Sequence, residues 1–152
     1  MFVWTEYLQQ ELAVDACDHV ASGDFDGVLH GAKVRLFTNN MVPSKDTLVG
    51  DLTVPTYSGY ADVVASFGAP VRRDSGGIAT QGAVCSFAMP DATVPTSVYG
   101  YAIIDASTPA KLLGVEMFPG GRRDLADALD IISLVPEIAF GGPDQGSAHI
   151  ID

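Results

Sequence analysis

The sequence predicts a mainly β protein, specifically a jelly-roll-like antiparallel β-sandwich or barrel with one N-terminal α-helix. Three observations lead to this fold class. Apolar and alternating segments typical of strands recur along most of the chain. Gly and Pro residues, 16 and 9 in number, separate these segments. Only one segment has a helical pattern of sufficient length, so the chain lacks the alternation of strands and helices that is typical of a parallel sheet.

The N-terminal helix is predicted over residues 5–21. Thr5 is a candidate N-cap and Gly23 follows the expected end of the helix. Glu11, Asp15 and Asp18 form one acidic stripe, whereas the remaining sides are largely apolar. These sides are wider than one small sheet covers, so we expect a subunit contact at the start of the helix, through Trp4, Tyr7 and Leu8.

Residues 33–38 have the alternation of a half-buried strand. Val34 and Leu36 share one face, and Lys33 and Arg35 share the other. Asn39 and Asn40 end this strand, because Asn tolerates the backbone angles of turns. Further along, shorter strands are predicted over 47–49, 51–54 and 57–61, followed by extended chain over 62–67 and a β run over 78–89.

The strongest strand of the C-terminal half is predicted over 97–105. Both of its faces are apolar, with Tyr99 and Tyr101 expected on the same face, which places it in the middle of a sheet. Residues 111–118 are its expected hairpin partner across a loop longer than two residues. A single helical turn is predicted at 124–129 before a last strand over 131–140, where Pro136 requires an edge position or a bulge.

The sequence predicts one structural domain. Residues 1–27 hold the N-terminal helix and a linker, 28–141 the β-sandwich, and 142–152 a flexible C-terminal arm with an apolar tip at Ile150 and Ile151. Its 152 residues are enough for folding to bury roughly 68% of the surface of the unfolded chain. A core of this size needs no disulfides or metals.

Composition narrows the classes of partner. The formal charge of −11, from 19 acidic and 8 basic residues, opposes binding to nucleic acid. No apolar run approaches the ~20 residues that span a bilayer, and the first residues lack a secretory signal pattern, so we expect folding in the cytoplasm and no membrane partner. Cys17 and Cys85 are expected to be packed free thiols.

No constellation of residues points to catalysis. The candidate bases are His19, His30 and His149, and none adjoins a nucleophile motif. Glu116, the acid within an apolar strand, is expected to face solvent. The sequence has no phosphate-binding glycine motif and no zinc spacing, so we predict no catalytic residues, no cofactor and no metal. Four tyrosines are candidates for a sugar-binding face, although cross-strand packing is the favoured interpretation: Tyr57, Tyr60, Tyr99 and Tyr101.

The order of several segments resembles a group of small virion structural proteins of tailed bacteriophages. The similar segments are LFTNNxxPSxxT from Leu36 to Thr47, DLT from Asp51 to Thr53, YSGYA from Tyr57 to Ala61, VYGYAIID from Val98 to Asp105, and LLxxExF from Leu112 to Phe118. The similarity covers about residues 30–140, in order but with loose spacing. A tryptophan expected after the YSGYA segment is replaced by Phe67.

The resemblance implies a non-enzymatic coat component of the head decoration, or cement, type. Such a protein is expected to bind the major capsid protein, to form a homotrimer and to lie on the exterior of the capsid, where a negative charge keeps it apart from the packed genome. A tail- or baseplate-associated module that binds a receptor or glycan is the alternative.

Overall fold

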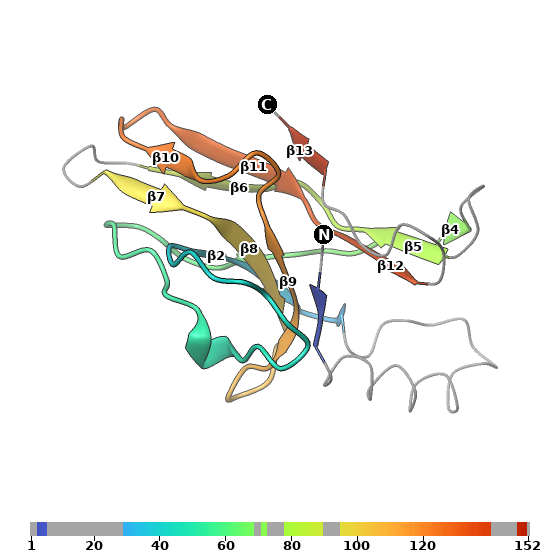
Figure 1. Ribbon diagram of the computed structural model, residues 1–152. Helices are drawn as coiled ribbons and strands as arrows, with labels where there is room; N and C mark the ends of the chain where they lie inside the picture. Colours follow the sequence, from blue (N-terminus) through green and yellow to red (C-terminus); the bar gives the residue numbers. More distant parts are fainter. Residues whose placement is uncertain are drawn as a thin grey trace.

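The computed structural model describes residues 3–5, 29–68, 71–72, 78–89, 95–140 and 149–151. Across these residues the protein is mainly β, as predicted, and every strand pairing is antiparallel. The strands lie in two layers (Figure 1). Apart from Thr5, the predicted helix over 5–21 lies outside the described residues.

The lower layer in Figure 1 is a five-stranded sheet. Its strands follow the order β1 (Val3–Trp4), β9 (Leu112–Met117), β8 (Gly100–Ile104), β2 (Lys33–Phe37) and β3 (Val63–Val64). The predictions for β2, for a central β8 and for the β8–β9 hairpin are confirmed, since β8 is buried at all five positions and lies between β9 and β2. Strands that are apolar on both faces need neighbours and cover on every side.

Two three-stranded sheets accompany the five-stranded sheet: one forms the upper layer in Figure 1, and the other lies to the right in that view. One has the order β13 (His149–Ile151), β11 (Ile131–Val135), β6 (Cys85–Ala88), and the other has the order β12 (Glu137–Phe140), β5 (Ile78–Gln81), β4 (Val71–Arg72). Pro136 divides the predicted last strand into β11 and β12, and β12 takes an edge position. A proline has no N–H for a sheet, so the chain changes sheets at this residue.

A pair of short strands contradicts two sequence predictions. The predicted strand over 97–105 is interrupted at Tyr99, and its first part becomes β7 (Thr96–Val98), which pairs with β10 (Arg123–Leu125). The predicted helical turn at 124–129 is therefore wrong at its start. The chain instead turns at 127–130, where the Asp130 carboxylate accepts hydrogen bonds from the N–H groups of Ala126 and Asp127 at 2.7 and 2.9 Å.

Within the described residues 29–68, the structure has no strand at 47–49, 51–54 or 57–61, where the sequence predicts short strands. Residues 38–62 instead form a long loop with one 3₁₀ helix, η1 (Val49–Asp51). Side chains take the place of strand partners: the Asp51 carboxylate accepts from the Leu48 N–H at 2.8 Å, and the Asn39 amide bonds to the Asp51 carbonyl and the Thr53 N–H. Asp and Asn compete with sheet pairing in this way.

The buried apolar side chains form two cores, one on each face of the five-stranded sheet. The main core lies between the layers, and it includes Leu36 and Ile103 from the lower sheet and Phe87 and Leu134 from the upper one. The second core lies on the outer face of the five-stranded sheet. There, residues of the 38–52 loop such as Leu52, Met41 and Val49 pack against the sheet. Both faces of the five-stranded sheet are therefore covered.

Candidate functional site

The described residues form an open groove beside the five-stranded sheet. Its volume is about 830 Å³. It lies between the 38–52 loop and the end of the β8–β9 hairpin, and residues of both segments line it, together with Thr5 after β1 and Arg35 on β2. The groove results from the loop that covers the sheet, so its shape depends on the second core.

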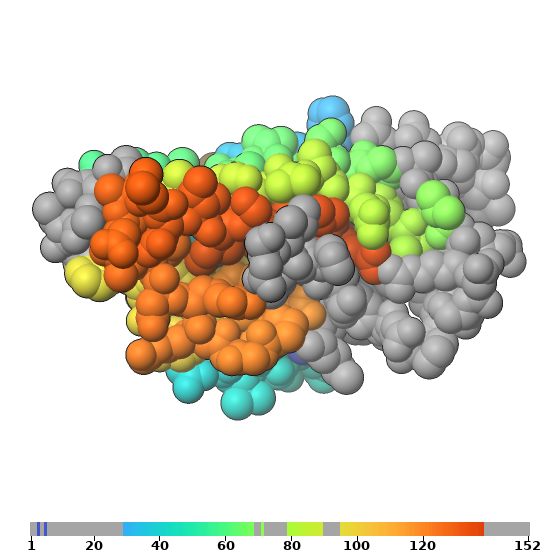
Figure 2. Space-filling model, turned by 90° about the horizontal axis from the view of Figure 1, so that it is seen from above, coloured from blue at the N-terminus to red at the C-terminus, as the bar shows by residue number. Residues whose placement is uncertain are grey.

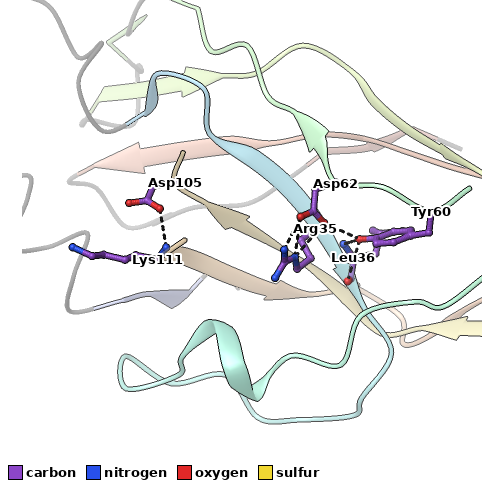
Figure 3. Close-up of polar contacts among 6 residues, drawn as sticks. All are labelled: Arg35, Leu36, Tyr60, Asp62, Asp105 and Lys111. Atoms are coloured by element: carbon purple, nitrogen blue, oxygen red, sulfur yellow. Dashed lines mark hydrogen bonds and ion pairs between the residues drawn. The ribbon is translucent and has the colours of Figure 1, made fainter. Parts of the chain in front are cut away.

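Arg35 is fixed in the groove wall by a carboxylate (Figure 3). Its guanidinium donates to both oxygens of Asp62, from Nε at 3.1 Å to each and from Nη2 to Oδ2 at 2.7 Å. The hydrogen bond to Asp62 raises the pKa of Arg35. A forked pair of this kind fixes direction as well as distance, so Arg35 joins β2 to the segment after Tyr60.

Tyr60 completes the same cluster. Its hydroxyl accepts from the Leu36 N–H at 2.8 Å and lies 3.3 Å from Oδ1 of Asp62. Burial raises the pKa of Tyr60 well above its ordinary value. The Tyr60 hydroxyl thus satisfies a backbone N–H of β2 that has no strand partner on that side. Arg35, Tyr60 and Asp62 together hold the 60–62 segment against β2.

The opposite end of the groove is formed by the hairpin loop between β8 and β9. The buried Asp105 carboxylate accepts from the Lys111 N–H at 2.7 Å and from the hydroxyl and N–H of Ser107 at 2.6 and 3.2 Å (Figure 3). Hydrogen bonds from two backbone N–H groups fix the Asp105 carboxylate within the hairpin loop. Its role here is structural.

Basic side chains outnumber acidic ones among the described lining residues, although the Arg35 charge is paired with Asp62 and the Lys45 charge with Asp46. Arg35, Lys45 and Lys111 contribute the cations, and Asp46 is the acid among the lining residues, with its carboxylate 2.8 Å from the Lys45 ammonium. None of the described residues that line the groove is His, Cys or Glu. These side chains are suited to hydrogen bonding and to attracting an anionic group. Proton-transfer catalysis needs a different arrangement, a base close to a nucleophile.

The predicted solvent-facing position of Glu116 is wrong. Glu116 is 2% exposed, and its Oε2 accepts from the hydroxyl of Tyr101 at 2.6 Å within the main core. Burial and the nearby carboxylate raise the pKa of Tyr101. Alternation along β9 does place the Glu116 side chain on the other face of the strand from Val115 and Met117. However, the second layer covers that face as well, so no side of the strand is left to water.

Tyrosines of the described segments pack against other core side chains, in agreement with the favoured interpretation. The rings of Tyr57 and Tyr60 meet edge to face at 5.4 Å, and Tyr60 stacks on Phe87 at 6.1 Å. The expectation that Tyr99 and Tyr101 share one face is wrong. The interruption at Tyr99 turns its ring toward the second core, whereas Tyr101 is in the main core.

The candidate bases and the thiol that the structure describes lie in different elements of the fold. His30 is exposed just before β2, His149 lies in β13, and His19 is outside the described residues. Cys85 is a buried free thiol whose pKa is raised by burial, as predicted for a packed cysteine, and Cys17 lies outside the described residues. Within the described part of the chain no group of three or more His, Cys, Asp or Glu side chains is arranged to hold a metal ion.

The predicted contact residues belong to two different sheets. Trp4 lies in β1 at the edge of the five-stranded sheet, paired with Gly114. Ile150 and Ile151 lie in β13, paired with Leu134 and Ser133 of β11. Tyr7 and Leu8 are outside the described residues. The C-terminal part predicted as a flexible arm thus includes a strand at its described end.

Comparisons with known proteins give no identification. No protein-family model, no curated protein and no solved structure matches this chain. Among the helical segments that the structure describes, none has the length and apolar character needed to cross a bilayer.

Proposed function

We propose that this protein is a non-enzymatic structural protein of a tailed-phage virion, most specifically a decoration or cement protein that binds the major capsid protein and stabilises the shell. The proposal includes jelly-roll-like connectivity, the N-terminal helix over 5–21, a homotrimer and a position on the capsid exterior. A cement protein must add contact area at joints between shell subunits, so it needs a rigid scaffold and apolar contact points more than a catalytic pocket.

The observation that carries the proposal is the division of side chains between interior and surface. The buried carboxylates of Glu116 and Asp105 have hydrogen-bond partners inside the protein, as Glu116 does in the hydroxyl of Tyr101. In contrast, large aliphatic side chains are exposed at loops and strand ends: Val42 and Leu129 at 91%, Leu48 and Val71 at 67%, Ile131 at 60%, Val64 at 58% and Val84 at 54%. Polar chemistry thus supports the fold, and apolar surface is available for partners.

The resemblance to virion proteins lies on the same framework. The similar segments 98–105 and 112–118 contain β8 and β9, and segment 36–47 runs from the end of β2 into the loop that covers the sheet. The strands β2, β8 and β9 contribute many of the fully buried side chains of the described chain. The resemblance therefore concerns the scaffold on which a decoration protein depends.

The test is cosedimentation with phage heads. Purified heads that lack the protein are mixed with the full chain, separated on a gradient, and assayed for bound protein and for the temperature at which DNA is released. We expect saturable binding at a fixed ratio to the major capsid protein and a higher release temperature. Heads that bind no protein at saturating concentration would refute the proposal.

The groove favours a second candidate function, a receptor- or glycan-binding module of the tail or baseplate. Its volume of about 830 Å³ and its Arg35 and Lys111 side chains are compatible with an acidic sugar. A glycan array probed with the full chain distinguishes the two functions. Saturable binding that is lost in the Lys111→Ala variant supports the module, and absence of binding leaves the decoration function in place.

A further inference from the structure

The outer face of the β13–β11–β6 sheet carries no charged side chain on strands β6 and β11. Register pairs Ile131 with Ala88 and Ser133 with Ser86, while Phe87 and Cys85 point inward. In Figure 2 these strands, yellow-green β6 and red-orange β11, lie side by side on the visible surface. We define the uncharged face by its outward residues on the two strands: Ser86, Ala88, Ile131, Ser133 and Val135.

Three of the five side chains of this face are small, those of Ser86, Ala88 and Ser133. The hydroxyls of Ser86 and Ser133 lie 2.9 Å apart and satisfy each other across the strands. Ile131 is 60% exposed. Sheets that face water commonly carry long charged side chains, which keep other sheets away. Their absence from these described positions allows a second sheet to pack at close range.

The two layers differ in how their outer faces are covered. The outer face of the five-stranded sheet is covered by the chain's own 38–52 loop, through the second core. On the uncharged face, Ser86 and Ala88 are exposed, and Ser133 and Val135 are partly exposed. The fold therefore provides its own cover for one sheet and leaves an apolar side chain, Ile131, open on the other.

Charge limits the surfaces through which two copies of this chain can meet. Two copies of a chain with a formal charge of −11 repel each other, and an acid within the contact would add a desolvation cost. The nearest acid along β11, Asp130, is held in its turn by two backbone N–H groups. Among the described surfaces, the uncharged face is one through which like-charged copies can approach without burying a carboxylate.

We propose that the uncharged face is a self-association surface, occupied by a second copy of this chain. The proposal rests on the proposed function, because it gives a location to the contact between copies of a decoration protein. The face as defined covers two short strands, β6 with four residues and β11 with five. At about 4.8 Å between strands and about 3.3 Å per residue, it is much smaller than the roughly 800 Å² per partner of stable complexes. Association in solution is therefore weak, in the micromolar range or above, and becomes effective when copies are held near one another on a shell.

The first test uses sedimentation equilibrium of the full chain and three variants. Ile131→Asp and Ile131→Lys place either sign of charge on the face, and Val42→Asp makes the same type of change at a 91% exposed position in the 38–52 loop. We expect both Ile131 variants to weaken association by about tenfold or more, because either charge must be desolvated. Val42→Asp is expected to associate like the parent chain. Circular dichroism and thermal melting confirm that each variant is folded.

Salt gives an independent readout. Copies of like charge that meet through a neutral face associate more strongly as salt screens their repulsion, whereas contacts between opposite charges weaken. We expect tighter association when ionic strength rises from about 0.05 to about 0.5 M. A monomer at all concentrations, equal association of the Ile131→Asp variant, or weaker association in salt would overturn the proposal.

Head binding separates this proposal from the proposed function. If the Ile131→Asp variant keeps its oligomeric state but no longer binds heads, the face contacts the shell and the self-association proposal is wrong. If the parent chain associates and the variant does not, while neither binds heads, the surface is supported and the decoration function is refuted.

Discussion

At the scale of single residues, the most informative feature is a buried carboxylate that meets a tyrosine hydroxyl. Glu116 and Tyr101 are 2% and 1% exposed, and their oxygens are 2.6 Å apart. Neither group is reached by water, so each depends on partners inside the protein. A buried acceptor that loses its donor incurs a desolvation cost that water does not offset.

The Tyr101→Phe substitution tests this pair. It keeps the ring, which stacks on Phe118 at 6.4 Å, and removes the hydrogen bond to Glu116. We expect the free energy of unfolding to fall by about 1–3 kcal/mol, as measured by urea denaturation.

Tyr57→Phe is the matched control. The Tyr57 hydroxyl is buried without a hydrogen-bond partner, and burial raises its pKa. Its removal is expected to leave stability unchanged or slightly higher, within about 0.5 kcal/mol. Equal losses in the two variants would show that the bond to Glu116 contributes nothing.

Gly100 is a second residue whose identity the packing requires. A Cβ at this position would lie 2.1 Å from the Glu116 carbonyl oxygen and 2.6 Å from the Phe37 ring. We expect Gly100→Ala to lower the free energy of unfolding by about 3 kcal/mol or more, because the clash involves backbone. At Gly50, in η1, a Cβ meets nothing within 4 Å, so Gly50→Ala is expected to be neutral or slightly stabilising in the same measurement. A stable Gly100→Ala variant contradicts the close approach of β8 and β9.

At the scale of elements, the sequence predicts strands well where a pattern within the strand decides the structure. Alternation in Lys33–Phe37 and apolar residues on both faces of Gly100–Ile104 are sufficient to predict β2 and the central β8. The prediction fails where distant partners decide. β10 exists because it pairs with β7, and the 38–62 segment avoids strands because Asn39 and Asp51 bond to nearby backbone groups.

The candidate site is less predictable than the fold, for the same reason. Arg35 and Lys111 are distant in sequence, and they line one groove only because a covering loop and a hairpin meet there. No motif marks such a meeting. The burial of Glu116 also depends on a second layer that no local pattern reveals. The alternation of strand Cys85–Ala88 is consistent with the packed Cys85 that the sequence predicts. Tyr57 and Tyr60 also pack against each other as predicted, but they do so from a loop, where strand periodicity does not apply.

The C-terminal strand gives a prediction at this scale. β13 pairs with β11 through three residues, at Ser133, Leu134 and Val135. Deletion of residues 149–152 removes this pairing and leaves an edge of β11 open. We expect the free energy of unfolding to fall by about 1–2 kcal/mol and aggregation on heating to increase, as measured by urea denaturation and light scattering.

Deletion of residue 152 alone is the control, because it leaves the three paired residues of β13 in place. Parent-like behaviour is expected for this variant. If the longer deletion also behaves like the parent chain, the β11–β13 pairing contributes nothing to stability.

At the scale of the whole molecule, buried tyrosines couple stability to alkaline pH. Burial raises the pKa of Tyr57, Tyr60 and Tyr101, and Glu116 adds to the rise at Tyr101. A raised pKa means that the folded protein holds its phenolic protons at pH values where the unfolded chain has released them. Stability is therefore complete below the unfolded pKa of about 10 and falls as the pH rises above it.

This coupling is measurable in the slope of stability against pH. Above pH 10, each tyrosine that stays protonated only in the folded state steepens the fall by up to about 1.4 kcal/mol per pH unit. We expect the Tyr101→Phe variant to show a shallower slope than the parent chain by about that amount, in urea denaturation between about pH 9.5 and 11.5. The tyrosinate absorbance of the folded parent should likewise appear at higher pH than that of the urea-unfolded chain. Identical slopes, or simultaneous titration of the folded and unfolded chains, would show that these hydroxyls are open to water, and the two-layer core around Tyr101 would have to be revised.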